Sequence, residues 1–99
     1  MRRALDYLHA NIGETLRVED IAREAGLNIR SLQLGFKAAY SVSPMRYLRN
    51  IRLDAARYLL SRRQNRESVT EVAYSVGFSH LGRFSQEYRA RFGSSPSAE

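Results

Sequence analysis

The chain of 99 residues contains no cysteine and only two histidines, His9 and His80. The missing thiols exclude a disulfide-stapled fold, a thiolate zinc site and a cysteine nucleophile, and two histidines are too few for a histidine-rich metal site. No apolar run approaches the roughly 20 residues that a membrane-spanning helix needs, so we expect a soluble protein. The first residues also lack the basic-then-apolar pattern of a signal peptide.

Lysine is almost absent, whereas arginine is abundant. The 16 basic residues comprise Lys37 and otherwise only arginine; with ten acidic residues the net charge is +6. Residues 1–50 and residues 51–99 each carry eight basic and five acidic residues, hence +3 in each half. The planar guanidinium group matches phosphates and guanine edges, so this bias favours a polyanionic partner, above all a nucleic acid.

Valine, isoleucine and threonine are sparse, and apolar residues recur every three or four positions without strand-like alternation. This periodicity predicts an all-α protein. We expect helices over about residues 2–11, 18–25, 28–40, 44–61, 68–76 and 79–92, with one more turn opened by Ser95-Pro96. The polar run at 62–67 is predicted to be a loop.

Several helix boundaries carry local signals. Asn28 is an expected N-cap, Ser43-Pro44 combines a cap residue with a proline at the first helical position, and Ser68 with Glu71 forms a capping box. Gly13 is predicted to end the first helix.

The second half of the chain repeats the first. Ile21-Ala22 recurs as Val72-Ala73, and Gly26-Leu27 recurs as Gly77-Phe78, at an offset of 51. Farther along the offset is 52, in the pairs Leu32 and Phe84, Phe36 and Tyr88, Lys37 and Arg89, Tyr40 and Phe92, and Ser43-Pro44 and Ser95-Pro96. The chain is therefore a duplicated unit, and two copies of one unit indicate two copies of one task.

Each copy has the pattern of a helix-turn-helix. Ala22 and Ala73 are small enough to let a second helix cross closely, and Gly26 and Gly77 suit the positive φ of a tight turn. The expected core residues of the second helices are Leu32, Phe36, Phe84, Tyr88 and Phe92. Basic side chains gather on the same two helices: Arg30 and Lys37 with no acid, then Arg83, Arg89 and Arg91 with only Glu87. These are the helices that would face DNA.

The chain resembles the DNA-binding region of AraC/XylS-type bacterial transcription regulators over essentially its whole length. The resemblance is carried by Ile21-Ala22, Gly26-Leu27, Leu32-Gln33, Phe36-Lys37, Ser43-Pro44, Tyr47-Leu48, Arg52-Leu53, Ala56, Leu59-Leu60, Val72-Ala73, Val76-Gly77-Phe78, Phe84-Ser85, Tyr88-Arg89, Phe92-Gly93 and Ser95-Pro96. It implies about seven helices: a first helix-turn-helix subdomain at 1–43, a linker helix at 44–62 and a second subdomain at 63–99. It also implies a sequence-specific regulator of transcription that binds double-stranded DNA in the cytoplasm, on the nucleoid, without a cofactor.

The resemblance places the outward positions of the first unit at Asn28, Arg30, Ser31, Gln33 and Leu34. In the second unit they are Ser79, His80, Leu81, Gly82, Arg83 and Gln86. Candidate phosphate contacts are Lys37, Arg46, Arg52 and Arg89. Among these, Arg30 suits guanine, and Gln33 suits adenine or a phosphate. In the second unit Arg83, followed by Gln86, is the strongest candidate for a base contact. Leu34 stands where the family often has arginine, and His80 has a structural role at a helix start as its alternative.

A linker helix over 44–61 would be 18 residues, roughly 27 Å long, with an apolar stripe of Leu48, Ile51, Ala55 and Leu59. Such a rod would set two reading helices about one DNA turn, ~34 Å, apart, so that both enter successive major grooves. A shorter spacing would require the DNA to bend.

Three other functions are less consistent with the sequence than the binding of double-stranded DNA. The sequence has no carboxylate pair in an apolar frame, no serine beside a base and no glycine-rich phosphate loop, which speaks against an enzyme. A basic helical module that binds an acidic protein partner, such as RNA polymerase, is the main alternative. RNA binding is disfavoured because the aromatic residues occupy core positions. We expect a monomer that is either a fragment of a longer regulator, whose sensing or dimerisation domain is not in this sequence, or a short stand-alone member of the family, with the fragment favoured.

Overall fold

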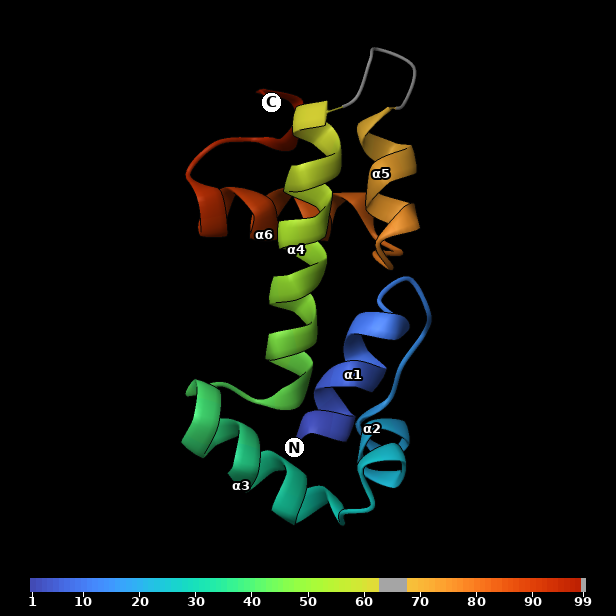
Figure 1. The fold of residues 1–99 in the computed structure, drawn as a ribbon. Helices are drawn as coiled ribbons and strands as arrows, with labels where there is room; N and C mark the ends of the chain where they lie inside the picture. The colour runs from blue at the N-terminus through green and yellow to red at the C-terminus, as the bar shows by residue number, and fades with distance from the viewer. Residues whose placement is uncertain (63–67, 99) are drawn as a thin grey trace. The chain divides into compact units, whose positions relative to one another are not determined.

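The computed structural model describes residues 1–62 and 68–98, and these residues form only helices and the turns between them (Figure 1). The elements are α1 (Arg2–Ala10), α2 (Val18–Ala25), α3 (Ile29–Tyr40), α4 (Pro44–Arg62), α5 (Val69–Ser75), α6 (Leu81–Phe92) and one 3₁₀ turn, η1 (Pro96–Ala98). The all-α prediction is confirmed. The predicted loop at 62–67 is wrong at Arg62, which is the last residue of α4, and its remaining residues, 63–67, lie outside the described residues. Among the helices described, none is both long and apolar enough to cross a membrane.

Two helix starts follow the predicted local signals. The Asn28 Oδ1 accepts a hydrogen bond from the backbone N–H of Ser31 at 2.7 Å, so Asn28 caps α3. At the start of α5, the Glu71 amide donates to the Ser68 Oγ at 3.0 Å, and the Ser68 amide donates to the Glu71 carboxylate at 3.4 Å. Both the N-cap and the capping box are therefore confirmed.

The end of α1 differs from the prediction. Gly13 does not end the helix: α1 stops at Ala10, and Gly13 is not among the glycines with positive φ. The Asn11 amide instead donates to the carbonyls of Tyr7 and Leu8, and the Asn11 side chain donates to the Tyr7 carbonyl at 2.9 Å. A side-chain amide thus satisfies a helix-end carbonyl without a glycine turn.

The chain divides into two compact units, residues 1–51 and 52–99, and each has its own hydrophobic core. The core of the first unit is formed by Ala4, Leu8, Ile21, Ala22, Leu32, Phe36 and Leu48. The core of the second unit is formed by Leu53, Ala56, Leu60, Val72, Ala73, Val76, Phe78, Phe84 and Tyr88. Four of the five predicted core anchors are thus fully buried, and Phe92 is half-buried against the second core.

The two predicted helix-turn-helix turns are built from the same hydrogen bonds. The Leu27 amide donates to the Ala22 carbonyl at 2.9 Å, and the Phe78 amide donates to the Ala73 carbonyl at 3.0 Å. This bond closes a turn in which the intervening glycine is left-handed, with φ of 70° at Gly26 and 100° at Gly77. Both alanines are buried, as a close crossing of the second helix requires. The duplication seen in the sequence is therefore a duplication of structure.

The repeat also includes the helix that precedes each helix-turn-helix. Ala4 and Leu8 on α1 correspond to Ala56 and Leu60 on α4 at the offset of 52, and all four are buried. The end of α4 therefore has in the second unit the role that α1 has in the first.

α4 contributes separate residues to the two cores. The single apolar stripe predicted for this helix is wrong in its second half, where Leu53, Ala56 and Leu60 are the fully buried residues. Ala55 and Leu59 are half-buried beside them. One stripe would suit a helix that serves one core, whereas α4 begins in the first unit and ends in the second.

The two units differ at the end of α3 and α6. Helix α6 ends at Gly93 with φ of 82°, whereas α3 ends 52 residues earlier at Ser41 with φ of 63°. The amides of both residues donate to a carbonyl four residues back, Lys37 for Ser41 and Arg89 for Gly93. Ser41 is the one non-glycine residue with positive φ in the described part of the chain, and that conformation costs such a residue about 1–2 kcal/mol.

Candidate nucleic-acid interface

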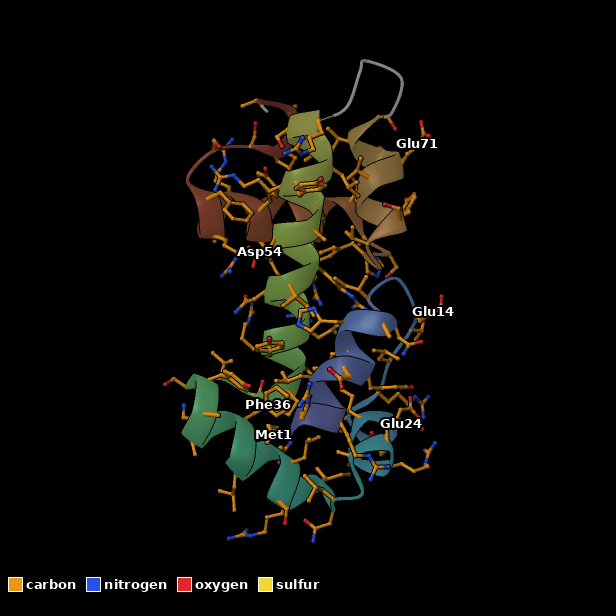
Figure 2. All side chains as sticks on the ribbon, in the orientation of Figure 1. Met1, Glu14, Glu24, Phe36, Asp54 and Glu71 are labelled. Atoms are coloured by element: carbon orange, nitrogen blue, oxygen red, sulfur yellow. The ribbon has the colours of Figure 1, made fainter. Side chains whose placement is uncertain are left out.

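The inner face of α3 is held by buried side chains. Leu32 and Phe36 are 0% exposed. The Phe36 ring, labelled in Figure 2, lies 5.5 Å from the rings of Tyr40 and Tyr47, measured between centroids. Burial and the neighbouring Tyr40 raise the pKa of the Tyr47 hydroxyl, so this hydroxyl stays protonated at neutral pH. These contacts determine which residues of α3 face solvent.

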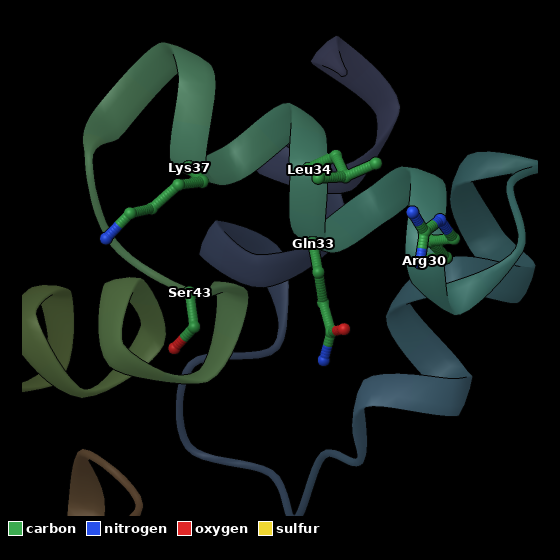
Figure 3. A pocket seen from close by; sticks show the side chains of 5 residues that line it. All are labelled: Arg30, Gln33, Leu34, Lys37 and Ser43. Carbon is green, nitrogen blue, oxygen red and sulfur yellow. The ribbon is translucent and has the colours of Figure 1, made fainter.

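The outer face of α3 gathers most of the DNA contacts predicted for the first unit. Arg30, Ser31, Gln33, Leu34 and Lys37 are all exposed. All of them except Ser31 line, together with Ser43, an open depression of about 340 Å³ (Figure 3). Within residues 1–62 and 68–98, neither Arg30 nor Lys37 forms an ion pair, so the charge of both is available to a ligand.

Ser43 belongs to this depression although the sequence marked it only as a helix start. Its hydroxyl accepts a hydrogen bond from the Arg46 amide at 3.1 Å and so caps α4. In Figure 3 the side chains of Ser43 and Gln33 point the same way, beside Lys37. The signal that could have found Ser43 is the short link between α3 and α4, which brings the start of α4 close to the end of α3.

Two predicted contacts at the start of α3, Asn28 and Ser31, do not line the depression. Asn28 is occupied as a cap through its Oδ1, which leaves its exposed NH₂ group free to donate to a ligand. The Ser31 amide is the donor of that cap bond, and its exposed hydroxyl stays on the surface. Both residues thus combine a structural and a potential binding group.

α6 carries the predicted contacts of the second unit around its own buried face. Phe84 and Tyr88 are 0% exposed, and the Phe84 ring lies 5.0 Å from that of Phe78. The predicted contacts are all exposed, namely Ser79 and His80 before the helix and Leu81, Gly82, Arg83, Gln86 and Arg89 on it.

Two of these α6 positions have informative geometry. His80 occupies the N-cap position of α6, but its side chain makes no capping hydrogen bond. A Cβ at Gly82 would meet nothing within 4 Å, so the gap that this glycine leaves on the helix surface is open.

Arg91, which the sequence grouped with the DNA-facing cations of α6, is engaged elsewhere. Its Nε and Nη2 donate to the two carboxylate oxygens of Asp54 on α4, at 2.9 and 3.0 Å. Its guanidinium also lies 5.6 Å from the centre of the Phe92 ring. This bidentate pair fastens the end of α6 to α4, and sequence reasoning missed it because 37 residues separate the partners.

The two arginines predicted to contact phosphates from α4 lie in different units. Arg46 is exposed in the first unit, and Arg52 is half-buried in the second. Both already interact with other groups of the chain. Four predicted contacts of the first unit, Arg30, Gln33, Leu34 and Lys37, thus line one depression. Most of those of the second unit lie on α6 or directly before it, and Arg46 and Arg52 lie apart on α4.

The chain is similar in sequence to a known protein family and to known regulatory proteins. Residues 21–99 match a family model described as a helix-turn-helix domain. The probable thc operon regulatory protein of Rhodococcus erythropolis is 45% identical over 100 residues, which cover 100% of this chain and 30% of that protein. The XylDLEGF operon transcriptional activator 2 of Pseudomonas putida is 38% identical over 96 residues, which cover 96% of this chain and 61% of the activator. The chain therefore spans less than two thirds of either relative.

Solved structures are similar over nearly the whole chain. An AraC-type transcriptional regulator from Chromobacterium violaceum has a TM-score of 0.91 and 33% identity, covering 98% of this chain and 85% of that one. The DNA-binding domain of AdpA, solved in complex with a target DNA, has a TM-score of 0.88 and 27% identity, covering 98% of this chain and 86% of that one.

Proposed function

Since the chain belongs to the AraC-type helix-turn-helix family of bacterial transcription regulators, we propose that it binds duplex DNA sequence-specifically through α3 and α6. The family consists of DNA-binding regulators and not of enzymes. In this proposal the two helices enter successive major grooves of one duplex, and the domain acts on nucleoid DNA in the cytoplasm. A single copy of the chain supplies both helices, so it binds as a monomer.

One observation carries the proposal: α3 and α6 each bury two large side chains and expose cations that form no ion pair within residues 1–62 and 68–98, namely Arg30, Lys37, Arg83 and Arg89. Leu32 and Phe36 on α3 correspond to Phe84 and Tyr88 on α6, and all four are 0% exposed. A helix anchored in this way presents a fixed set of side chains, which is what reading base edges in the major groove requires.

The residues of the outer faces suit different parts of DNA. Arg30 and Arg83 are exposed guanidinium groups without an ion pair in the described chain, and each can donate two parallel hydrogen bonds to guanine. Gln86 can bond adenine in the same bidentate manner, and Gln33 can bond adenine or a phosphate. His80, with no capping bond of its own, adds a donor at the start of α6.

Phosphate contacts would surround these base contacts. Lys37 and Arg89 lie toward the ends of the two reading helices, and Asn28 and Ser31 lie at the start of α3, where backbone amides and the helix dipole attract anions. Arg46 and Arg52 would supply further contacts from α4 after exchanging their present partners. Such contacts set affinity and register but carry no sequence information.

The direct test is the affinity of the 99-residue chain for duplex DNA as a function of salt. A protein that neutralises 6–10 phosphates loses about 10³–10⁵ in affinity between roughly 50 and 200 mM salt. Failure to bind any duplex at low salt would refute the proposal and favour an acidic protein as the partner.

A pair of charge-matched variants then tests the reading helix itself. Arg83→Ala removes a cation from α6, whereas Arg23→Ala removes one from α2, where Arg23 pairs with Asp20 at 3.2 Å. We expect Arg83→Ala to weaken binding to a selected sequence by ~1–3 kcal/mol and to relax preference at one base pair. Arg23→Ala should change affinity little. An equal loss for Arg83→Ala on selected and random DNA would make Arg83 a phosphate contact instead.

A further inference from the structure

A leucine stands in the middle of the cationic face of α3. Leu34 is 58% exposed, more than most other apolar side chains of the chain. It lines the depression between the positions of Arg30 and Lys37, and Figure 3 shows all three side chains on the same helix. Residues four before and three after lie on the same helical face, so Leu34 shares its surface with both cations.

Leu34 has no evident task in folding. α3 is anchored by Leu32 and Phe36, both 0% exposed, and Leu34 is not part of the core of the first unit. Its apolar surface is therefore available to a ligand, and burying that surface on binding would be favourable.

Few chemical groups on the base edges of DNA are suited to contact the apolar side chain of Leu34. Base edges in the major groove are hydrogen-bond donors and acceptors, with one apolar exception, the 5-methyl group of thymine. A leucine pressed against a donor or acceptor would remove its water without replacing the hydrogen bond, which is costly. We propose that Leu34 contacts the 5-methyl group of a thymine and so selects thymine at one position of the DNA site, an inference that rests on the proposed function.

The second unit carries different chemistry at the same place. The position 52 residues after Leu34 is Gln86, whose amide suits adenine, and the position 52 residues after Arg30 is Gly82. The equivalent surfaces of α3 and α6 therefore carry different side chains for base recognition. The thymine contact belongs to the half of the site that α3 occupies, and the two half-sites differ in sequence.

Deoxyuridine tests this contact because it differs from thymidine only by the 5-methyl group. The 99-residue chain is first used to select a binding sequence from random duplexes, and each thymine of that sequence is then replaced singly by uracil. Losing the burial of one methyl group should weaken binding about threefold to fivefold at a single thymine. Replacing that thymine by 5-methylcytosine should weaken binding less than replacing it by cytosine.

The variant Leu34→Ala completes the test. Because Leu34 lies on the surface, the variant should keep the thermal midpoint of the wild-type chain, and it should bind the thymine and uracil duplexes equally. In the converse variant, Gln86→Leu, a new thymine preference should appear in the other half-site.

Each outcome decides the inference. Equal binding of the wild-type chain to all thymine and uracil duplexes, with specific binding intact, overturns the thymine contact and leaves the proposed function standing. A thymine-to-uracil difference that persists in Leu34→Ala assigns the methyl contact to another residue and overturns it as well. If no sequence is selected at all, the proposed function itself fails.

Discussion

Ser41 and Gly93 occupy the same position in the two repeats, and exchanging their residue types is expected to shift stability in opposite directions. Each ends a reading helix in the left-handed conformation, with φ of 63° at Ser41 and 82° at Gly93. Each donates its amide to a carbonyl four residues back, at 3.0 and 2.8 Å. The two sites therefore differ mainly in the presence of a Cβ atom.

The magnitude follows from two opposing terms. Ser41→Gly relieves about 1–2 kcal/mol of left-handed strain, but glycine makes the unfolded chain more flexible, which returns about 0.4–1 kcal/mol. The net gain should be about 0.5–1 kcal/mol. Gly93→Ser should lose a similar amount, and because a Cβ at Gly93 meets nothing within 4 Å, that loss cannot come from a steric clash.

Thermal unfolding followed by circular dichroism measures both changes. For a domain of about 60–100 residues, 1 kcal/mol shifts the midpoint by roughly 4–8 °C, so Ser41→Gly should raise the midpoint by a few degrees and Gly93→Ser should lower it. If Ser41→Gly lowers the midpoint, the serine is not strained and the reasoning from backbone conformation is wrong.

Three more substitutions test the packing around the reading helices. Ala73→Leu overfills the buried crossing of the second unit and should cost ~1–3 kcal/mol in urea unfolding; an unchanged midpoint would contradict a close crossing. Gly35→Ala should raise the thermal midpoint, because alanine favours a helix by about 1 kcal/mol and its Cβ meets only the movable end of the Met1 side chain; a lower midpoint would mean that Met1 cannot move. Asp54→Asn breaks the pair with Arg91 and should lower the free energy of unfolding by at most about 1 kcal/mol, since both side chains are partly exposed. This loss of stability should shrink in high salt, and a salt-independent loss would contradict an ionic origin.

Local signals in the sequence were sufficient to predict most helix boundaries. Asn28 and the box of Ser68 and Glu71 act within four residues, so their hydrogen bonds can be inferred without knowing the fold. The glycine turns were predictable for a second reason, because Gly26 and Gly77 recur in register. The prediction that Gly13 ends α1 is wrong because the helix already stops at Ala10, where the Asn11 side chain donates to the Tyr7 carbonyl.

Contacts between distant segments could not be predicted in the same way. Nothing in the sequence around Asp54 or Arg91 indicates that these two side chains, 37 residues apart, form a salt bridge. The buried residues of α4 were partly misplaced because periodicity cannot show that one helix serves two cores. The DNA-contacting roles of Arg30, Leu34 and Arg83 stay predictions.

The most direct test of the central claim, that both units read one duplex, is a hydroxyl-radical footprint of the chain on its selected sequence, repeated with Arg83→Ala. The account predicts two protected segments about one helical turn, roughly 10 base pairs, apart, and, at concentrations that saturate the variant, weaker protection mainly in one of them. A single protected segment, or equal protection of both segments by the saturating variant, would contradict it.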